Sequence, residues 1–131
     1  MAEGLLRYVA QEHGLDIEVK SAGIAVYEDS YAAANSINTM AAIDIDISDH
    51  KSVQINEHLI EEADLILTIS TGHKNEILYK FPSHEEKVFN LLEYAYDSDQ
   101  DVADPFGGSL ETYEKTRNEI YVAIVDIVEK L

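Results

Sequence analysis

The residues most suggestive of chemistry lie in the stretch DVADPFGGSLETY, residues 101–113. Asp104 precedes Pro105, and a proline restricts the backbone of the residue before it, so this pair is typical of a turn. Phe106, two glycines and Ser109 follow, and a serine in this position can cap a helix. The stretch therefore predicts a loop that presents one carboxylate, which could exchange a proton with a substrate. The alternative is an Asp-Pro turn with a purely structural role.

Histidine and cysteine, the most versatile metal-binding residues, form no metal-binding pattern here. The chain has no cysteine, and its five histidines are His13, His50, His58, His73 and His84. No two histidines lie four residues apart on one predicted helix, so we expect surface or capping roles for them and no metal site. The lack of cysteine also excludes a disulfide framework and, within these 131 residues, a cysteine nucleophile.

Three aspartates near this loop resemble the start of a calcium-binding site. Asp97, Asp99 and Asp101 would occupy positions one, three and five of such a site. However, position six requires glycine and is Val102, and position twelve requires glutamate and is Gly108. A solvated acidic loop is the better interpretation, and no cofactor is expected.

Length and charge limit the class of protein. The chain has 131 residues, 46% of them hydrophobic, which is the size of one domain over residues 1–131. Its formal net charge of -17 disfavours nucleic acid and anionic membranes as partners, because both are bound through clustered cations. No apolar run reaches the roughly 18 residues of a membrane span, and the first residues are too polar for a signal peptide. A cytoplasmic protein is therefore expected.

Hydrophobic periodicity predicts helices and strands in alternation, with Asn56 and Ser109 as helix caps. Helices are expected over residues 1–13, 30–43, 54–63, 70–81 and 109–131, and strands over Asp16–Ala22, 43–48, Asp64–Ser70 and 86–94. Segment 43–48 could equally be an extended connector. The alternation favours an α/β fold, an open three-layer sandwich in which a parallel sheet of about four strands has helices on both faces.

The expected order has one anomaly, because folds of this kind normally begin with a strand. The first strand, which would be the central one between Asp16–Ala22 and Asp64–Ser70, is expected to be missing from an N-terminally truncated domain. The loss of its buried aliphatic residues would cost on the order of 6–12 kcal/mol, which is comparable to the whole stability of a typical domain. We therefore expect that the chain alone is weakly folded, or that another segment completes it, including through self-association.

Several short stretches, taken in order, carry a family resemblance. They are MAEGLLR at 1–7, SAG at 21–23, IDISDHKS at 45–52, EEADLILTIS at 61–70, HK at 73–74, KVFNL at 87–91 and DPFGGSLETY at 104–113. Individually, motifs such as SAG and HK are unspecific. In this order and spacing, they make the chain similar to the low-molecular-weight, cysteine-dependent protein phosphatases over essentially its full length.

The resemblance implies a mechanism that needs no metal. In the family, a loop of a cysteine, five further residues and an arginine follows a first strand; its backbone amides hold the phosphate while the thiolate attacks phosphorus. Asp104 matches the family's general acid and base, and Phe106 matches an aromatic residue beside the substrate. The cysteine and the arginine match nothing here, since Arg7 and Arg117 both lie in predicted helices. The chain as it stands is therefore expected to be inactive.

The resemblance leaves two substrate classes and two kinds of function open. Family members act on phosphotyrosine or phosphoarginine in phosphorylated proteins, and DPFGGS with Glu93 and Tyr94 upstream resembles the arginine type more. Ser21 would support the phosphate loop in the family, or simply end a strand. The alternatives to an enzyme are a non-catalytic phosphatase-like binding module or remnant and, more remotely, an unrelated acidic α/β signalling domain.

Overall fold

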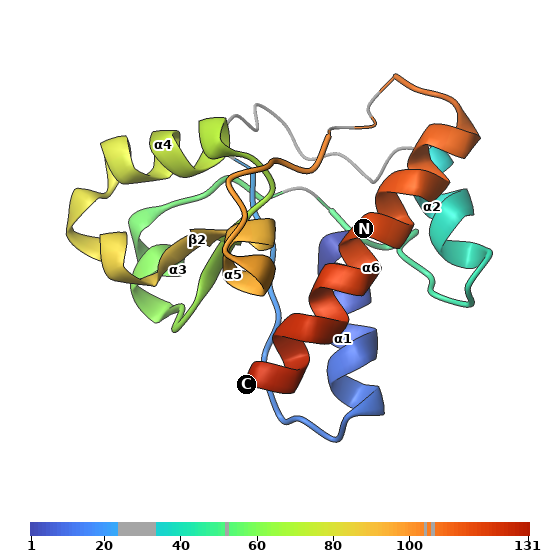
Figure 1. The fold of residues 1–131 in the computed structure, drawn as a ribbon, viewed down its shortest axis with the longest axis horizontal. Coiled ribbons are helices and arrows are strands. Elements are labelled where there is room, and N and C mark those ends of the chain that lie inside the picture. The colour runs from blue at the N-terminus through green and yellow to red at the C-terminus, as the bar shows by residue number, and fades with distance from the viewer. Residues whose placement is uncertain (24–33, 52, 104, 106) are drawn as a thin grey trace.

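The computed structural model describes residues 1–23, 34–51, 53–103, 105 and 107–131, so Asp104 and Phe106 lie outside the described residues. In chain order its elements are α1 (Ala2–Glu12), α2 (Ala34–Ala41), α3 (Glu57–Glu62), β1 (Ile66–Thr68), α4 (Thr71–Lys80), the 3-10 helix η1 (Pro82–Lys87), β2 (Val88–Asn90), α5 (Leu91–Tyr96) and α6 (Leu110–Lys130). Figure 1 shows the short pair of strands beside α3, α4 and α5 on one side of the molecule, with α1, α2 and α6 gathered on the other side. The predicted α/β class is confirmed.

The two strands that the structure describes form a parallel pair, as predicted. Residues Ile66 to Thr68 of β1 pair in register with Val88 to Asn90 of β2. β2 is shorter than predicted because the chain turns into α5 at Leu91. The backbone amide of Asn90 donates to Glu93 Oε1 at 3.1 Å, which is half of a capping box and begins a helix where the periodicity indicated more strand.

Two other predicted strands are not strands in the structure. A strand needs a hydrogen-bonded neighbour, and in the described residues Asp16–Ala22 has none; only Gly23 forms a single parallel bridge, to Gln54. Segment 43–48 is the extended connector that the sequence left open, with Ile45 and Ile47 buried in the core. The sheet order therefore contains only β1 and β2 in the part of the chain that is described, and the prediction of about four strands is corrected.

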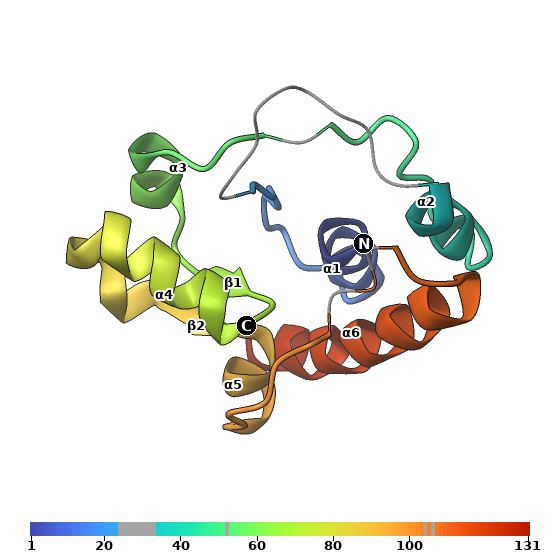
Figure 2. The ribbon, with the colours of Figure 1, turned by 90° about the horizontal axis from the view of Figure 1, so that it is seen from above.

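The main core surrounds α6, which contacts α1, α2 and α5 (Figures 1 and 2). The residues that recur every three to four positions along α6 are buried: Tyr113, Thr116, Ile120, Ile124 and Ile127. Leu131 continues this spacing but is 49% exposed, because it lies beyond the last residue of the helix. The predicted caps are confirmed, since Asn56 accepts from the amide of Leu59 and Ser109 from that of Thr112. The Ser109 cap thus fixes the end of the loop that precedes α6.

Across the described residues, none of the helices combines the length and the apolar character that crossing a membrane requires.

Candidate active site

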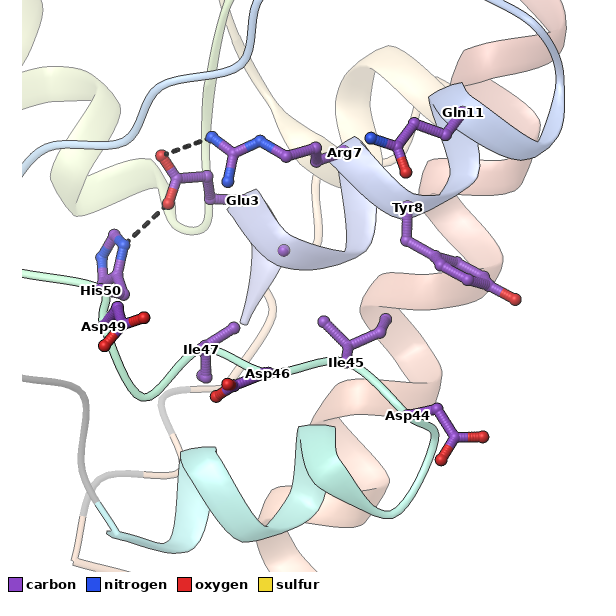
Figure 3. A pocket seen from close by; sticks show the side chains of 11 residues that line it. Glu3, Arg7, Tyr8, Gln11, Asp44, Ile45, Asp46, Ile47, Asp49 and His50 are labelled. Atoms are coloured by element: carbon purple, nitrogen blue, oxygen red, sulfur yellow. Dashed lines mark ion pairs between the residues drawn. The ribbon is translucent and has the colours of Figure 1, made fainter.

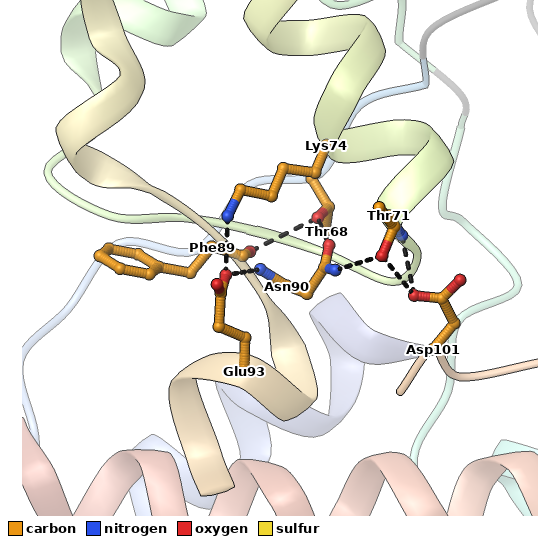
Figure 4. Close-up of polar contacts among 7 residues, drawn as sticks. All are labelled: Thr68, Thr71, Lys74, Phe89, Asn90, Glu93 and Asp101. Atoms are coloured by element: carbon orange, nitrogen blue, oxygen red, sulfur yellow. Dashed lines mark hydrogen bonds and ion pairs between the residues drawn. The ribbon is translucent and has the colours of Figure 1, made fainter. Parts of the chain in front are cut away.

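Polar side chains form a continuous network where β1 and β2 end (Figure 4). The hydroxyl of Thr68 donates to the side-chain oxygen of Asn90, which links the last residues of the two strands. Asn90 Nδ2 donates to Thr71 Oγ1 at 3.1 Å, and Thr71 donates both its amide and its hydroxyl to Asp101 Oδ1, at 2.8 and 2.9 Å. Thr68 and Asn90 are only 5% exposed. Thr71 and Asp101 are exposed, so the network runs from the core to the surface. Its buried, hydrogen-bonded part rigidifies the surroundings, here the edge where α/β folds bind their ligands.

A second branch of the network joins α4 to α5. Lys74 Nζ lies 2.8 Å from Glu93 Oε1, the same oxygen that accepts from the amide of Asn90. The hydrogen bond from Lys74, followed by the bond from the Asn90 amide, holds the pKa of Glu93 below its usual value. Lys74 also lies 6.0 Å from the ring centroid of Phe89. The Lys of the HK motif and the Glu upstream of DPFGGS are thus direct partners.

The loop between α5 and α6 carries the predicted site residues Asp104 and Phe106, which lie outside the described residues. On the described part of this loop, Val102 is buried and its amide donates to the carbonyl of Ile69 at 3.0 Å. Gly107 has φ of 79°, a left-handed conformation that favours glycine. A Cβ on Gly108 would lie 2.9 Å from the carbonyl oxygen of Pro105. Both glycines of the DPFGGS motif are therefore required by the loop's backbone.

A second polar cluster lies beside the first turn of α1 (Figure 3). His50 Nδ1 is 2.7 Å from Glu3 Oε2, and its other ring nitrogen is 3.5 Å from Ser21 Oγ. Glu3 also pairs with Arg7 at 3.5 Å, and this cluster borders a pocket of about 390 Å³ between α1 and residues 44–50. Of these residues only Ser21 is a site candidate from the sequence. The pair of Glu3 and His50 joins residues far apart in the chain, and the one local signal is the four-residue spacing of Glu3 and Arg7.

The chain's two arginines have structural contacts. Arg7 donates to the carbonyl of Val19 at 2.8 Å, and Arg117 donates to the carbonyl of Thr39 at 2.9 Å. Both lie inside helices, α1 and α6, as predicted. That neither matches the family's phosphate-binding arginine stays a prediction. Among the residues with a described placement, no group of three or more His, Asp and Glu side chains could hold a metal ion. That no metal takes part stays a prediction.

Comparison with known proteins decides the family. The family described as "Low molecular weight phosphotyrosine protein phosphatase" matches residues 1–131, the whole chain. The chain belongs to this family. Among the curated family members, a protein-arginine-phosphatase of Bacillus subtilis is 35% identical over 131 residues, which are 100% of this chain and 87% of that protein. A second protein-arginine-phosphatase, from Geobacillus stearothermophilus, is 36% identical over 115 residues, 88% of this chain and 77% of its own length.

Solved structures of low molecular weight phosphatases confirm the fold. A mutant of YwlE from Bacillus subtilis has a TM-score of 0.95 and 34% sequence identity, and the match covers 98% of this chain and 86% of the YwlE chain. A low molecular weight protein tyrosine phosphatase from T. tengcongensis has the same TM-score and identity, and 99% of this chain and 88% of that one are covered. A YwlE arginine phosphatase in which serine replaces a cysteine carries a phosphorylated active-site serine. Its TM-score is 0.96 and its sequence identity 34%, and the match covers 99% of this chain and 85% of that chain. The family resemblance predicted from the short stretches is therefore confirmed.

Proposed function

We propose that this phosphatase-family protein removes phosphate from phosphorylated proteins through a phosphocysteine intermediate, formed on a cysteine that these 131 residues do not contain. The observation that carries the proposal is 35% identity to a protein-arginine-phosphatase over all 131 residues. We further propose that the chain by itself is inactive, because it offers no thiolate to attack phosphorus. A non-catalytic binding module is the second candidate, and the lack of cysteine is the observation that favours it.

The proposed reaction assigns Asp104 and Phe106 the roles that the family resemblance implies. The thiolate attacks phosphorus, the P–N bond of phosphoarginine or the P–O bond of phosphotyrosine breaks, and Asp104 gives its proton to the departing nitrogen or oxygen. The Asp104 carboxylate then takes a proton from the water that attacks the phosphocysteine, which releases phosphate and restores the thiolate. Phe106 would pack against the substrate. The amides at the start of α1 would help to hold the phosphate, since helix N-termini bind anions.

Phosphoarginine is the substrate that we propose. The match to the Bacillus subtilis protein-arginine-phosphatase covers 100% of this chain at 35% identity. Two tyrosine-phosphatase relatives cover less of it: PtpB of Staphylococcus epidermidis, 40% identical, covers 53%, and the probable low molecular weight protein-tyrosine-phosphatase EpsP of Ralstonia nicotianae, 34% identical, covers 88%. A phosphorylated guanidine is a basic leaving group that depends on protonation, which suits a positioned carboxylic acid.

The test of this proposal requires an extended protein. We define the extended protein as the full 131-residue chain preceded by a hydrophobic strand and a loop of a cysteine, five residues, an arginine, a serine and a proline. We expect vanadate-sensitive release of phosphate from phosphoarginine proteins, with kcat/KM at least about tenfold above that for phosphotyrosine peptides, which corresponds to about 1.4 kcal/mol of discrimination. Equal or reversed preference would contradict the phosphoarginine assignment, and turnover of neither substrate would favour the binding module.

A further inference from the structure

Asp101 holds the beginning of the loop before α6 against α4. Its Oδ1 accepts two hydrogen bonds from one residue, at 2.8 Å from the Thr71 amide and at 2.9 Å from the Thr71 hydroxyl (Figure 4). Thr71 is the first residue of α4, whose amide has no partner within the helix. A carboxylate in this position is also favoured by the helix dipole. Asp101 therefore joins the loop to a helix that lies 30 positions earlier in the sequence.

The partner of Asp101 is itself fixed by buried groups. Thr71 Oγ1 accepts from Asn90 Nδ2, and Asn90 in turn accepts from the hydroxyl of Thr68 at the end of β1. The neighbouring residue of the loop, Val102, is 2% exposed and its amide bonds to the carbonyl of Ile69. The exposed contact between Asp101 and Thr71 is thus backed by buried groups on both sides, Asn90 behind Thr71 and Val102 next to Asp101.

The end of the same loop is held by a different element. Asn35 Nδ2, on α2, donates to the carbonyl of Gly108 at 3.1 Å. The amide of Gly108 bonds back to the carbonyl of Pro105, and Ser109 caps α6. Both ends of the loop are therefore fixed, and only a few residues separate them. Three residues of chain can span at most about 11 Å, so the placement of Asp101 limits where Asp104 can be.

We propose that Asp101 is a positioning residue for the phosphatase reaction: its two bonds to Thr71 fix the start of the loop whose sequence contains the proposed general acid Asp104. This inference rests on the proposed function. Asp101 touches neither substrate nor the reacting atoms; it acts through Thr71 and through the short chain segment to Asp104. A residue with only a stabilising role would affect all substrates alike, whereas a residue that positions an acid affects most strongly the substrates whose leaving group needs a proton.

The test compares three variants of the extended protein on two substrates. In Asp101→Ala, we expect kcat/KM for phosphoarginine, which reports the steps up to formation of the phosphocysteine, to fall about 10- to 100-fold, the scale of a misplaced catalytic group. With p-nitrophenyl phosphate, whose leaving group hardly needs protonation, the loss should be less than about threefold. Asp101→Asn keeps an oxygen that can accept both Thr71 bonds and should retain most of the activity. Asp99→Ala is the matched control, because Asp99 is an exposed aspartate of the same loop.

A measurement on the unextended chain tests the contact without activity. Hydrogen exchange followed by NMR should show the Thr71 and Val102 amides exchanging at least about tenfold faster in Asp101→Ala, with the amides of α6 unchanged. Unchanged exchange would overturn the inference, as would equal losses of kcat/KM on both substrates. If Asp104→Asn impaired the extended protein and Asp101→Ala did not, the inference about Asp101 would be wrong and the proposed function would stand. Hydrolysis of neither substrate by the extended protein would overturn the proposed function and the inference with it.

Discussion

Replacement of Asp104 by asparagine in the extended protein is expected to lower kcat for phosphoarginine by about 10²- to 10⁴-fold, the usual contribution of a general acid or base. Asparagine is close to aspartate in size but cannot donate a proton to the leaving group or accept one from water. The substitution should affect both half-reactions, because Asp104 is proposed as the acid in the first and the base in the second. Steady-state kinetics with phosphoarginine, across pH, are the measurement.

The control for this prediction is Asp99→Asn, which makes the same chemical change at an exposed position of the same loop. Its kcat should stay within about twofold of the parent, and the limb of the pH profile that reports the acid should persist. For Asp104→Asn that limb should disappear. A kcat within about threefold of the parent in Asp104→Asn would show that another group supplies the proton.

Truncation of Ile124 to alanine is expected to have the largest effect on stability, lowering the free energy of unfolding by about 2–5 kcal/mol. Ile124 is 1% exposed and lies in the core where α6 contacts α1, α2 and α5. The lost side-chain atoms leave a cavity that surrounding helices cannot easily fill. Since a typical domain is stable by only about 5–15 kcal/mol, the change removes a large share of the total. Urea unfolding followed by circular dichroism measures it.

Val122→Ala is the matched control on the same helix, because Val122 is 57% exposed. It should change the free energy of unfolding by less than about 0.5 kcal/mol, since little apolar area leaves water at this position. If Ile124→Ala and Val122→Ala lowered the free energy of unfolding by the same amount, α6 would not be the centre of the core in solution.

Local sequence patterns predict helix faces and helix caps, because the residues that determine them lie within a few positions of one another. The three-to-four spacing of Ile120, Ile124 and Ile127 predicts the buried face of α6, and Ser109 predicts its start. The conformation of the loop explains the glycines of the DPFGGS motif, because Gly107 has a positive φ. Helix periodicity and capping act within a few residues, so a single sequence reveals them.

Features that depend on distant partners could not be predicted in this way. Asp16–Ala22 has the alternation of a strand, but alternation cannot say whether a neighbour is there to bond with it. The pair of Thr71 and Asp101 joins residues 30 positions apart, and Asp101 was interpreted only as part of a solvated acidic loop. Glu3 and His50 meet only through the packing of residues 44–50 on α1. In contrast, α5 could have been found, because Asn90 and Glu93 have the spacing of a capping box.

The central claim is that this chain carries the family's phosphatase fold and needs a cysteine from outside its 131 residues for turnover. The most direct measurement is phosphate release from a phosphoarginine protein by three samples under identical conditions: the 131-residue chain, the extended protein, and the extended protein with serine in place of its cysteine. We predict vanadate-sensitive turnover by the extended protein alone, several orders of magnitude above the other two, as expected when a nucleophile is removed. Vanadate-sensitive turnover by the 131-residue chain would contradict the account.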